Sequence, residues 1–396
     1  MDTMTVLSKE MYEQVHQLNT VAEAVELLLH YGHFRTLGDI LTKFHDGSDI
    51  RKILSTGLQL WFPESKPDAN DRKIRNWLGG KTQSVSKEDA FVISRILELT
   101  LDQTDDFLKY ACGEGIHWRN PEDIVWCYAI VHRLDPDQTE QLRQRANAAV
   151  ASSGKGAADA DSYTAEVRDA IVPSLHQGED ALLAFLKNEH TRLGTLHNTA
   201  YLLFTQYMDL LKRGWSECGM EFLFDDMTRQ EKKKAADAAD GDIGPHKAES
   251  LTVRDILETY LYRKCVPVQA RGKAQTPEVF SAIQKSVRQN WPDEAALSRM
   301  EARKLDVSRK ALILLFLATD GTDSEYEEYD SPESPDDVFD SLYTRMNTML
   351  TECGFPQLDP RNPFDWIILF CIACGDFWEI DGRLESVLTQ MYPSSV

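Results

Sequence analysis

Eight polar or basic side chains between positions 70 and 83 carry the clearest chemical signal in this sequence. They are Asn70, Arg72, Lys73, Arg75, Asn76, Lys81, Thr82 and Gln83. Arginine and lysine pair with phosphates and guanine edges, whereas asparagine and glutamine pair with adenine edges. From Lys66 to Gln83 there are five basic residues and two acidic ones, in a chain of formal net charge −21. The eight residues are therefore predicted to contact double-stranded DNA.

A short helix is expected to position most of this set. Asp68 or Asn70 is its predicted N-cap, and Trp77 anchors its buried face. Gly79 and Gly80 follow directly, as glycines do where helices end. Because the tryptophan side packs inward, the basic flank is expected to face solvent, as in a recognition helix.

Neighbouring helices are expected to complete a small bundle. The helix before is predicted from Asp49 to Trp61, and residues 62–67 form a connection longer than the usual tight turn. Ser86 is the expected N-cap of the helix after, with Asp89 in the capping-box position. A further helix is predicted to begin at Asp102.

Part of this bundle resembles the back half of the Cro/C1-type helix-turn-helix domains. The resemblance lies in Ile74-Arg75-Asn76-Trp77-Leu78-Gly79-Gly80-Lys81, the apolar helix that follows, and Leu99-Thr100-Leu101-Asp102. In that family an aromatic residue ends the recognition helix and a Gly-basic pair follows. The resemblance covers about residues 68–108, roughly a tenth of the chain. It implies a five-helix DNA-binding domain, usually dimeric, whose recognition helix contacts the major groove.

No catalytic, metal or cofactor site is predicted. Gly80-Lys81 lacks the earlier glycine of a phosphate-binding loop, since position 75 is arginine. Cys371 and Cys374 fall within an apolar helical run and have no second ligand pair. His117 and His197 are interpreted as hydrogen-bonded structural groups. The chain is therefore not expected to be an enzyme.

The composition indicates a folded cytoplasmic chain. With 396 residues, 42% of them hydrophobic, it can bury a core and form more than one domain. No apolar run approaches the roughly 20 residues that cross a bilayer, and the first residues lack a secretory pattern. The negative net charge argues against non-specific coating of nucleic acid or contact with an anionic membrane.

Helical periodicity dominates the sequence and predicts an all-α fold. The expected organisation is an N-terminal helical segment (1–35), a helix-turn-helix-like helical domain (36–147), a linker (148–162) and a helical C-terminal domain (163–396). The linker is small, polar and contains glycine. Mobile loops are expected at 228–248, which lacks large apolar groups, and at 320–337, where carboxylates repel one another.

Two functions remain open from the sequence. The first is a DNA-binding, transcriptional-regulator-like protein of bacterial or mobile-element type, whose C-terminal domain forms a homodimer or senses a signal or partner. The alternative is a non-enzymatic adaptor that uses the same surface to bind an unknown protein. The salt dependence of binding to duplex DNA separates them.

Overall fold

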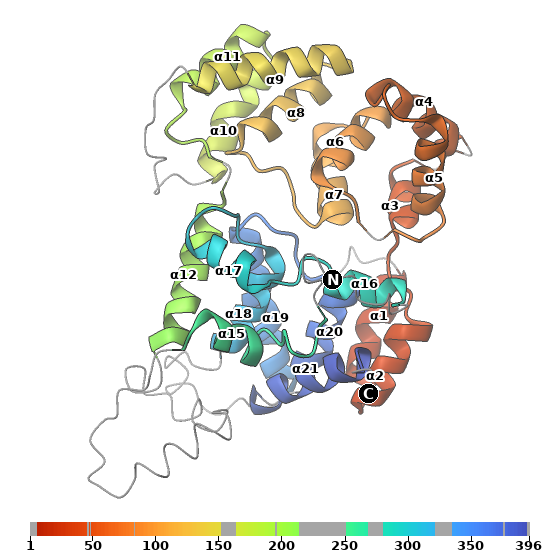
Figure 1. Ribbon diagram of the computed structural model, residues 1–396, viewed down its shortest axis with the longest axis vertical. Helices are drawn as coiled ribbons and strands as arrows, with labels where there is room; N and C mark the ends of the chain where they lie inside the picture. Colours follow the sequence, from red (N-terminus) through yellow and green to blue (C-terminus); the bar gives the residue numbers. More distant parts are fainter. Residues whose placement is uncertain are drawn as a thin grey trace, which may run out of the picture.

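The computed structural model describes residues 6–45, 47, 49–82, 84–151, 164–194, 196–213, 251–267, 280–320, 335–374 and 377–393. Within these ranges all regular elements are helices, which confirms the predicted all-α class (Figure 1). None of the helices described has the length and apolar character needed to cross a membrane. The loop expected at 228–248 lies outside the described residues. So do most of the expected linker at 148–162 and most of the loop expected at 320–337.

The upper half of the molecule in Figure 1 surrounds one hydrophobic core. Helices α3 to α7 pack on one another, and α8 connects them to α9, α10 and α11. The Phe91 ring of α6 stacks on Trp126 of α8, with 5.5 Å between centroids. The helices of this half are α3 (Leu37–Phe44), α4 (Ile50–Trp61), α5 (Pro67–Leu78), α6 (Lys87–Ile96), α7 (Leu101–Cys112), α8 (Pro121–Val131), α9 (Pro136–Ala151), α10 (Thr164–Leu175) and α11 (Glu179–Asn188).

The lower half brings both ends of the chain into a second core. The Trp366 indole nitrogen of α20 donates to the backbone oxygen of Met11 in α1, at 2.9 Å. The helices here are α1 (Val6–Gln17), α2 (Val21–Glu26), the π-helix η1 (Leu27–Tyr31), α12 (Asn198–Arg213), α15 (Val253–Thr259), α16 (Ala282–Arg288), α17 (Glu294–Glu301), α18 (Arg309–Asp320), α19 (Pro335–Glu352), α20 (Pro363–Ile372) and α21 (Phe377–Met391).

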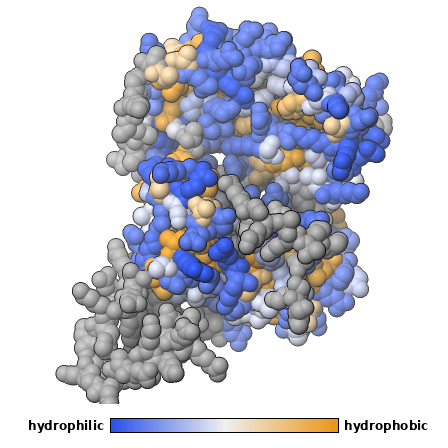
Figure 2. Space-filling view, viewed as in Figure 1, coloured by the Kyte–Doolittle hydropathy of each residue, from blue (hydrophilic) through white to orange (hydrophobic). Residues whose placement is uncertain are grey.

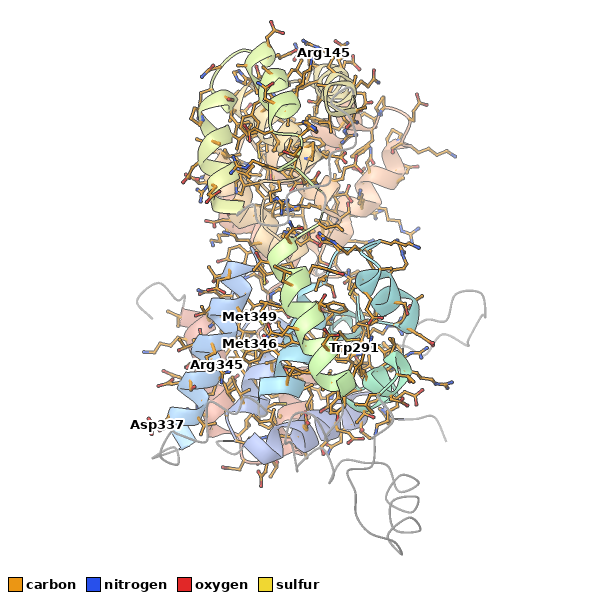
Figure 3. All side chains as sticks on the ribbon, turned by 90° about the vertical axis from the view of Figure 1, so that its left-hand side faces the viewer. Arg145, Trp291, Asp337, Arg345, Met346 and Met349 are labelled. Atoms are coloured by element: carbon orange, nitrogen blue, oxygen red, sulfur yellow. The ribbon has the colours of Figure 1, made fainter. Side chains whose placement is uncertain are left out.

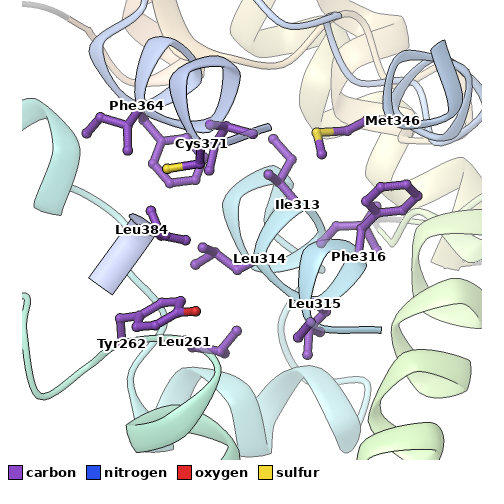
Figure 4. Close-up of a cluster of buried hydrophobic side chains, with 14 of the residues drawn as sticks. Leu261, Tyr262, Ile313, Leu314, Leu315, Phe316, Met346, Phe364, Cys371 and Leu384 are labelled. Atoms are coloured by element: carbon purple, nitrogen blue, oxygen red, sulfur yellow. The ribbon is translucent and has the colours of Figure 1, made fainter. Parts of the chain in front are cut away.

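The apolar helix α18 lies at the centre of the lower core. Its side chains Ile313, Leu314 and Phe316 are surrounded by residues of α19, α20 and α21, among them Met346 and Leu384 (Figure 4). The side view in Figure 3 separates this region, marked by Met346, from the upper half. Because α18 is apolar all round, only a position enclosed by other helices keeps its surface from water.

The two cores divide the chain differently from the boundaries expected from the sequence. Val167 of α10 and Leu182 of α11 belong to the same core as Leu142 of α9, so helices on both sides of 148–162 serve one core. Residues 1–35, expected as a separate segment, contribute Met11 and Leu28 to the lower core. A polar connection marks a loop, but the apolar faces of the helices beside it decide which core they join.

A series of charged groups joins the lower half to the upper half. The Arg309 guanidinium donates to both carboxylate oxygens of Asp365, at 2.7 and 2.9 Å. The same carboxylate accepts from the backbone nitrogen of Asp359 at 2.9 Å, and the Asp359 carboxylate pairs with Arg35. The Arg35 guanidinium lies 4.4 Å from the ring centroid of Tyr110 on α7, in the upper half.

Asp365→Asn should therefore lower the free energy of unfolding by about 3 kcal/mol, because it leaves the largely buried Arg309 without its anionic partner. Urea denaturation of the full chain measures the loss. Glu13→Gln, which removes one member of the exposed pair Lys9–Glu13, is the control and should change the value by less than about 0.5 kcal/mol. Equal effects of the two variants would contradict a structural role for the Arg309–Asp365 pair.

Candidate nucleic-acid interface

The predicted recognition helix is α5, and it begins slightly earlier than the sequence suggested. Lys66 is the N-cap residue and Pro67 the first helical residue, where its fixed φ and missing N–H fit the first turn. Asn70, one of the two expected caps, instead points inward and is only 6% exposed. The helix ends as predicted: Gly80 has φ +68°, a left-handed conformation that favours glycine.

The inner face of α5 is fixed by close packing. Ile74 and Trp77 are buried, and the helix contacts α3 and α4. At Gly38 of α3 the two backbones approach closely, since a Cβ there would lie 3.0 Å from the Leu78 carbonyl oxygen. With this face and this end of the helix held, the opposite side chains of α5 have a defined direction.

The outer face of α5 carries two exposed arginines. Arg72 and Arg75 are both exposed, as is Asp68 one turn earlier, so this spacing of three to four residues forms one strip along the helix. The Arg75 Nε donates to the backbone oxygen of Asp71 at 3.4 Å, which directs this guanidinium along the helix. Two of the eight predicted contact residues thus share one solvent-facing strip.

Helix α4 adds two exposed cations that the sequence analysis missed. Arg51 and Lys52 lie in its first turn and line, with Asp71 of α5, a shallow groove of about 390 Å³. Among the described residues, none of Arg51, Lys52, Arg72 and Arg75 forms an ion pair with a carboxylate. We call these four residues the α4–α5 basic surface. The outer edge of the upper half, over these helices, is mostly hydrophilic in Figure 2.

A signal for one of the two missed cations was present in the sequence. The buried residues Leu54 and Leu58 fix the inner face of α4, and helical periodicity places Lys52 on the opposite side. Arg51 lies one turn before Leu54 on the same side, so periodicity does not predict its exposure. Both cations were missed because they precede the resemblance to the known family by about 16 residues.

The Lys73 side chain is held by contacts within the protein and is not a free surface cation. Its ammonium lies 2.7 Å from a carboxylate oxygen of Asp89 on α6, and 5.2 Å from the Trp77 ring centroid. Ser86 is the N-cap of α6, as predicted, and accepts from the Asp89 backbone nitrogen at 3.1 Å. The Asp89 carboxylate, expected in a capping box, pairs with Lys73 instead. An opposite charge is a stronger partner than a neutral N–H.

The remaining predicted residues follow the end of α5. Lys81 is exposed, whereas Asn76 and Thr82 are partly buried. The backbone oxygen of Asn76 accepts from the Lys81 nitrogen at 3.0 Å, and that of Thr82 accepts from the Leu37 nitrogen at 3.2 Å. Gln83 lies outside the described residues. Lys81 is therefore available near the basic surface, while the backbone around it is tied to α3 and α5.

The structure also brings together residues that the sequence analysis kept apart. The His117 and His197 rings stack with 3.8 Å between centroids and an interplanar angle of 17°. The His197 Nδ1 lies 2.6 Å from a carboxylate oxygen of Asp306, which agrees with its interpretation as a hydrogen-bonded group. The His117 Nε2 has no hydrogen-bond partner among the described residues, so the interpretation does not hold for this nitrogen. The separation of 80 residues concealed the pair.

Cys371 of the Cys-x-x-Cys pair has the environment expected of a core thiol, whereas Cys374 is partly buried. Cys371 lies in α20 and is fully buried, and Cys374 follows the end of that helix. Burial, the largest cause, raises the pKa of the Cys371 thiol, which suppresses the thiolate needed for redox chemistry or metal binding.

No family model, curated protein or solved structure matches this chain. The resemblance to Cro/C1-type domains therefore stays a prediction from the sequence.

The contrast between Lys73 and Arg75 can be measured as stability. Lys73→Ala should lower the free energy of unfolding by about 1 kcal/mol, because it removes the partly buried pair with Asp89. Arg75→Ala should change it by less than about 0.5 kcal/mol. A double-mutant cycle of Lys73 and Asp89 isolates the pair, and a coupling energy of zero would show that Lys73 is not held by Asp89.

Proposed function

We propose that this chain is a non-enzymatic DNA-binding protein of the transcriptional-regulator type, and that the α4–α5 basic surface contacts the duplex. The observation that carries this proposal is the exposure of Arg51, Lys52, Arg72 and Arg75 on two adjoining helices without ion-pair partners among the described residues. Lys81 extends the surface at the end of α5.

The local charge supports this proposal. Between Asp49 and Thr82 there are seven basic and four acidic residues, whereas the whole chain carries −21. Like charges on the rest of the molecule repel DNA, so an approaching duplex is directed toward a face that carries exposed cations. Such a protein is expected to bind DNA in one orientation and to bind weakly at high salt.

The arrangement of the helices also supports it. The side chains of Arg72 and Arg75 project from the outer strip of α5, where base edges in a major groove can be reached. Arg51 and Lys52 lie in the first turn of α4, a position suited to phosphate contacts. We propose that α5 is the recognition helix and that α4 contacts the backbone.

We propose that the lower half serves homodimerisation or the sensing of a signal or partner. Two copies of a single recognition helix read two half-sites, which is how small helix-turn-helix units gain specificity. The lower core is built mainly from α12 to α21 and holds α1 and α2 against it, so it is large enough to form a stable platform for a second copy.

Binding of the full chain to random-sequence duplex DNA, followed by fluorescence anisotropy over a salt series, tests the proposal. The logarithm of the association constant should fall linearly with the logarithm of salt concentration. The double variant Arg72→Ala/Arg75→Ala should reduce that slope by about 2 if both residues contact phosphate. If either reads a base instead, its loss should cost about 1–3 kcal/mol on a specific site.

Lys304→Ala is the matched control, because Lys304 is an exposed cation in the lower half, away from α4 and α5. It should leave both affinity and salt slope unchanged. Absence of binding at low salt, or equal losses in the control and the double variant, would contradict DNA recognition by this surface.

The second candidate function is an adaptor that binds a protein through the same face. Leu60 on α4 favours it, because its side chain is 62% exposed and lies on the same side of the helix as Lys52 and Thr56. An exposed leucine beside cations suits an acidic partner with an apolar residue. If the chain is an adaptor, the salt series should show no DNA binding. Leu60→Ser and Arg72→Ala should then both weaken the complex with the acidic protein partner.

A further inference from the structure

We propose that His117, His197 and Asp306 form a binding site for a divalent transition-metal ion, best suited to zinc, at the junction of the two halves. The atoms that these three side chains offer as ligands lie within 4.8 Å of one another. Two imidazoles and one carboxylate are a frequent zinc-binding set that leaves a fourth position for water or another ligand.

The three residues come from different parts of the molecule. His117 lies between α7 and α8 of the upper half. His197 directly precedes α12, and Asp306 lies between α17 and α18 of the lower half. An ion held by all three would connect the two hydrophobic cores, which otherwise meet through polar contacts such as Ser84–Gln289, at 3.1 Å.

The His117 side chain supplies the strongest indication of a missing partner. It is 2% exposed, and its Nε2 has no hydrogen-bond partner among the described residues. Its backbone nitrogen donates to Asp123 at 2.7 Å, so the residue is held in place while the ring nitrogen stays unpaired. A buried polar atom without a partner is costly, and an ion at this position would remove that cost.

The protonation state of His117 suits a ligand. Burial, and then the nearby charges of His197, Lys87 and Arg119, hold the pKa of the ring well below its usual range. The ring is therefore neutral at neutral pH and keeps the lone pair that a metal needs. The positive charge of Lys87 is compensated, since its ammonium lies 2.7 Å from a carboxylate oxygen of Asp123 and 3.3 Å from one of Glu114.

The other two residues are already oriented toward each other. One Asp306 carboxylate oxygen lies 2.6 Å from the His197 Nδ1, and the other accepts from the backbone nitrogens of His197 and Val307, at 2.9 and 3.0 Å. These bonds bring the two side chains together, but the bond between His197 and Asp306 must be exchanged for bonds to the ion, because a ring nitrogen that donates its proton to a carboxylate has no lone pair for a metal. Because the Asp306 side chain is 32% exposed, an ion can enter from solvent on this side.

Binding requires a small rearrangement. A tetrahedral zinc ion with bonds of about 2.0–2.1 Å places its donor atoms roughly 3.3 Å apart. The stacked rings of His117 and His197 must therefore rotate, and the ligand atoms must approach one another by up to about 1.5 Å. The proposal thus predicts that the two imidazoles lose their parallel stacking when the ion binds.

Calorimetric titration of the chelator-treated full chain with Zn²⁺ tests this site. One ion per chain is expected, and His117→Gln and Asp306→Asn should each weaken binding at least about tenfold. His190→Gln is the matched control, because the His190 ring bonds to the Lys187 backbone oxygen and is not one of the three residues of the cluster. Absence of saturable binding, or equal binding by the wild type and both ligand variants, would overturn the proposal.

A second measurement keeps the test decisive if a variant does not fold, which circular dichroism would reveal. X-ray absorption of the zinc-loaded wild-type chain should show two imidazole nitrogens with the remaining ligands oxygen. A shell that contains thiolate sulfur, or only oxygen, would overturn the assignment. Zinc should also raise the Tm of the wild type but not of the folded ligand variants, because the ion binds only the folded chain.

Discussion

The relation between the two halves depends on a continuous series of charged side chains that starts in the lower core and ends on an exposed tyrosine ring of the upper half. Arg309 holds Asp365, the Asp365 carboxylate holds the backbone at Asp359, and Asp359 pairs with Arg35, which lies over Tyr110. Burial raises the pKa of Asp359, and the Arg35 charge opposes that shift. Each charge is compensated by the next, so removing one member leaves a partly buried charge without a partner.

This series places the segment from Arg35 to Thr36, which leads directly into α3. Helix α3 packs against α5 through Gly38, so the position of the basic helix relative to the lower half follows from a few contacts. The orientation of Arg72 and Arg75 is thus fixed twice, by Trp77 on the inner face and by α3 at the end of the helix. A rigid support of this kind is what a recognition surface needs, because loosely held side chains lose conformational entropy on binding.

Another connection between the halves is the histidine pair. His117 belongs to the upper half, and His197 is held by Asp306 of the lower half, so the ring contact crosses the same junction as the Arg35 pair. Together with contacts such as Ser84–Gln289 and Arg361–Asp39, these contacts define the junction more firmly than one would, since a single contact leaves rotation free. A change at either contact is therefore expected to alter how the basic surface is presented to a partner of the lower half.

The sequence by itself determined the helical class, the end of α5, the cap of α6 and the inner face of α5. These properties are local: Gly80 at the end of α5 and Ser86 before α6 act on backbone groups within three residues of themselves. The exposed strip of Arg72 and Arg75 follows from the burial of Trp77 on the same helix, so helical periodicity was sufficient to predict it.

Only the tertiary structure decided which helices share a core and which polar groups meet. The polar stretch at 148–162 predicted a boundary, yet α9 and α11 on either side of it pack together. Lys73, expected on the DNA-binding surface, instead pairs with the Asp89 carboxylate 16 residues further along the chain. His117 and His197, 80 residues apart in the sequence, stack on each other in the fold. Such pairings depend on the distance between side chains in space, which the spacing of residues along the chain does not contain.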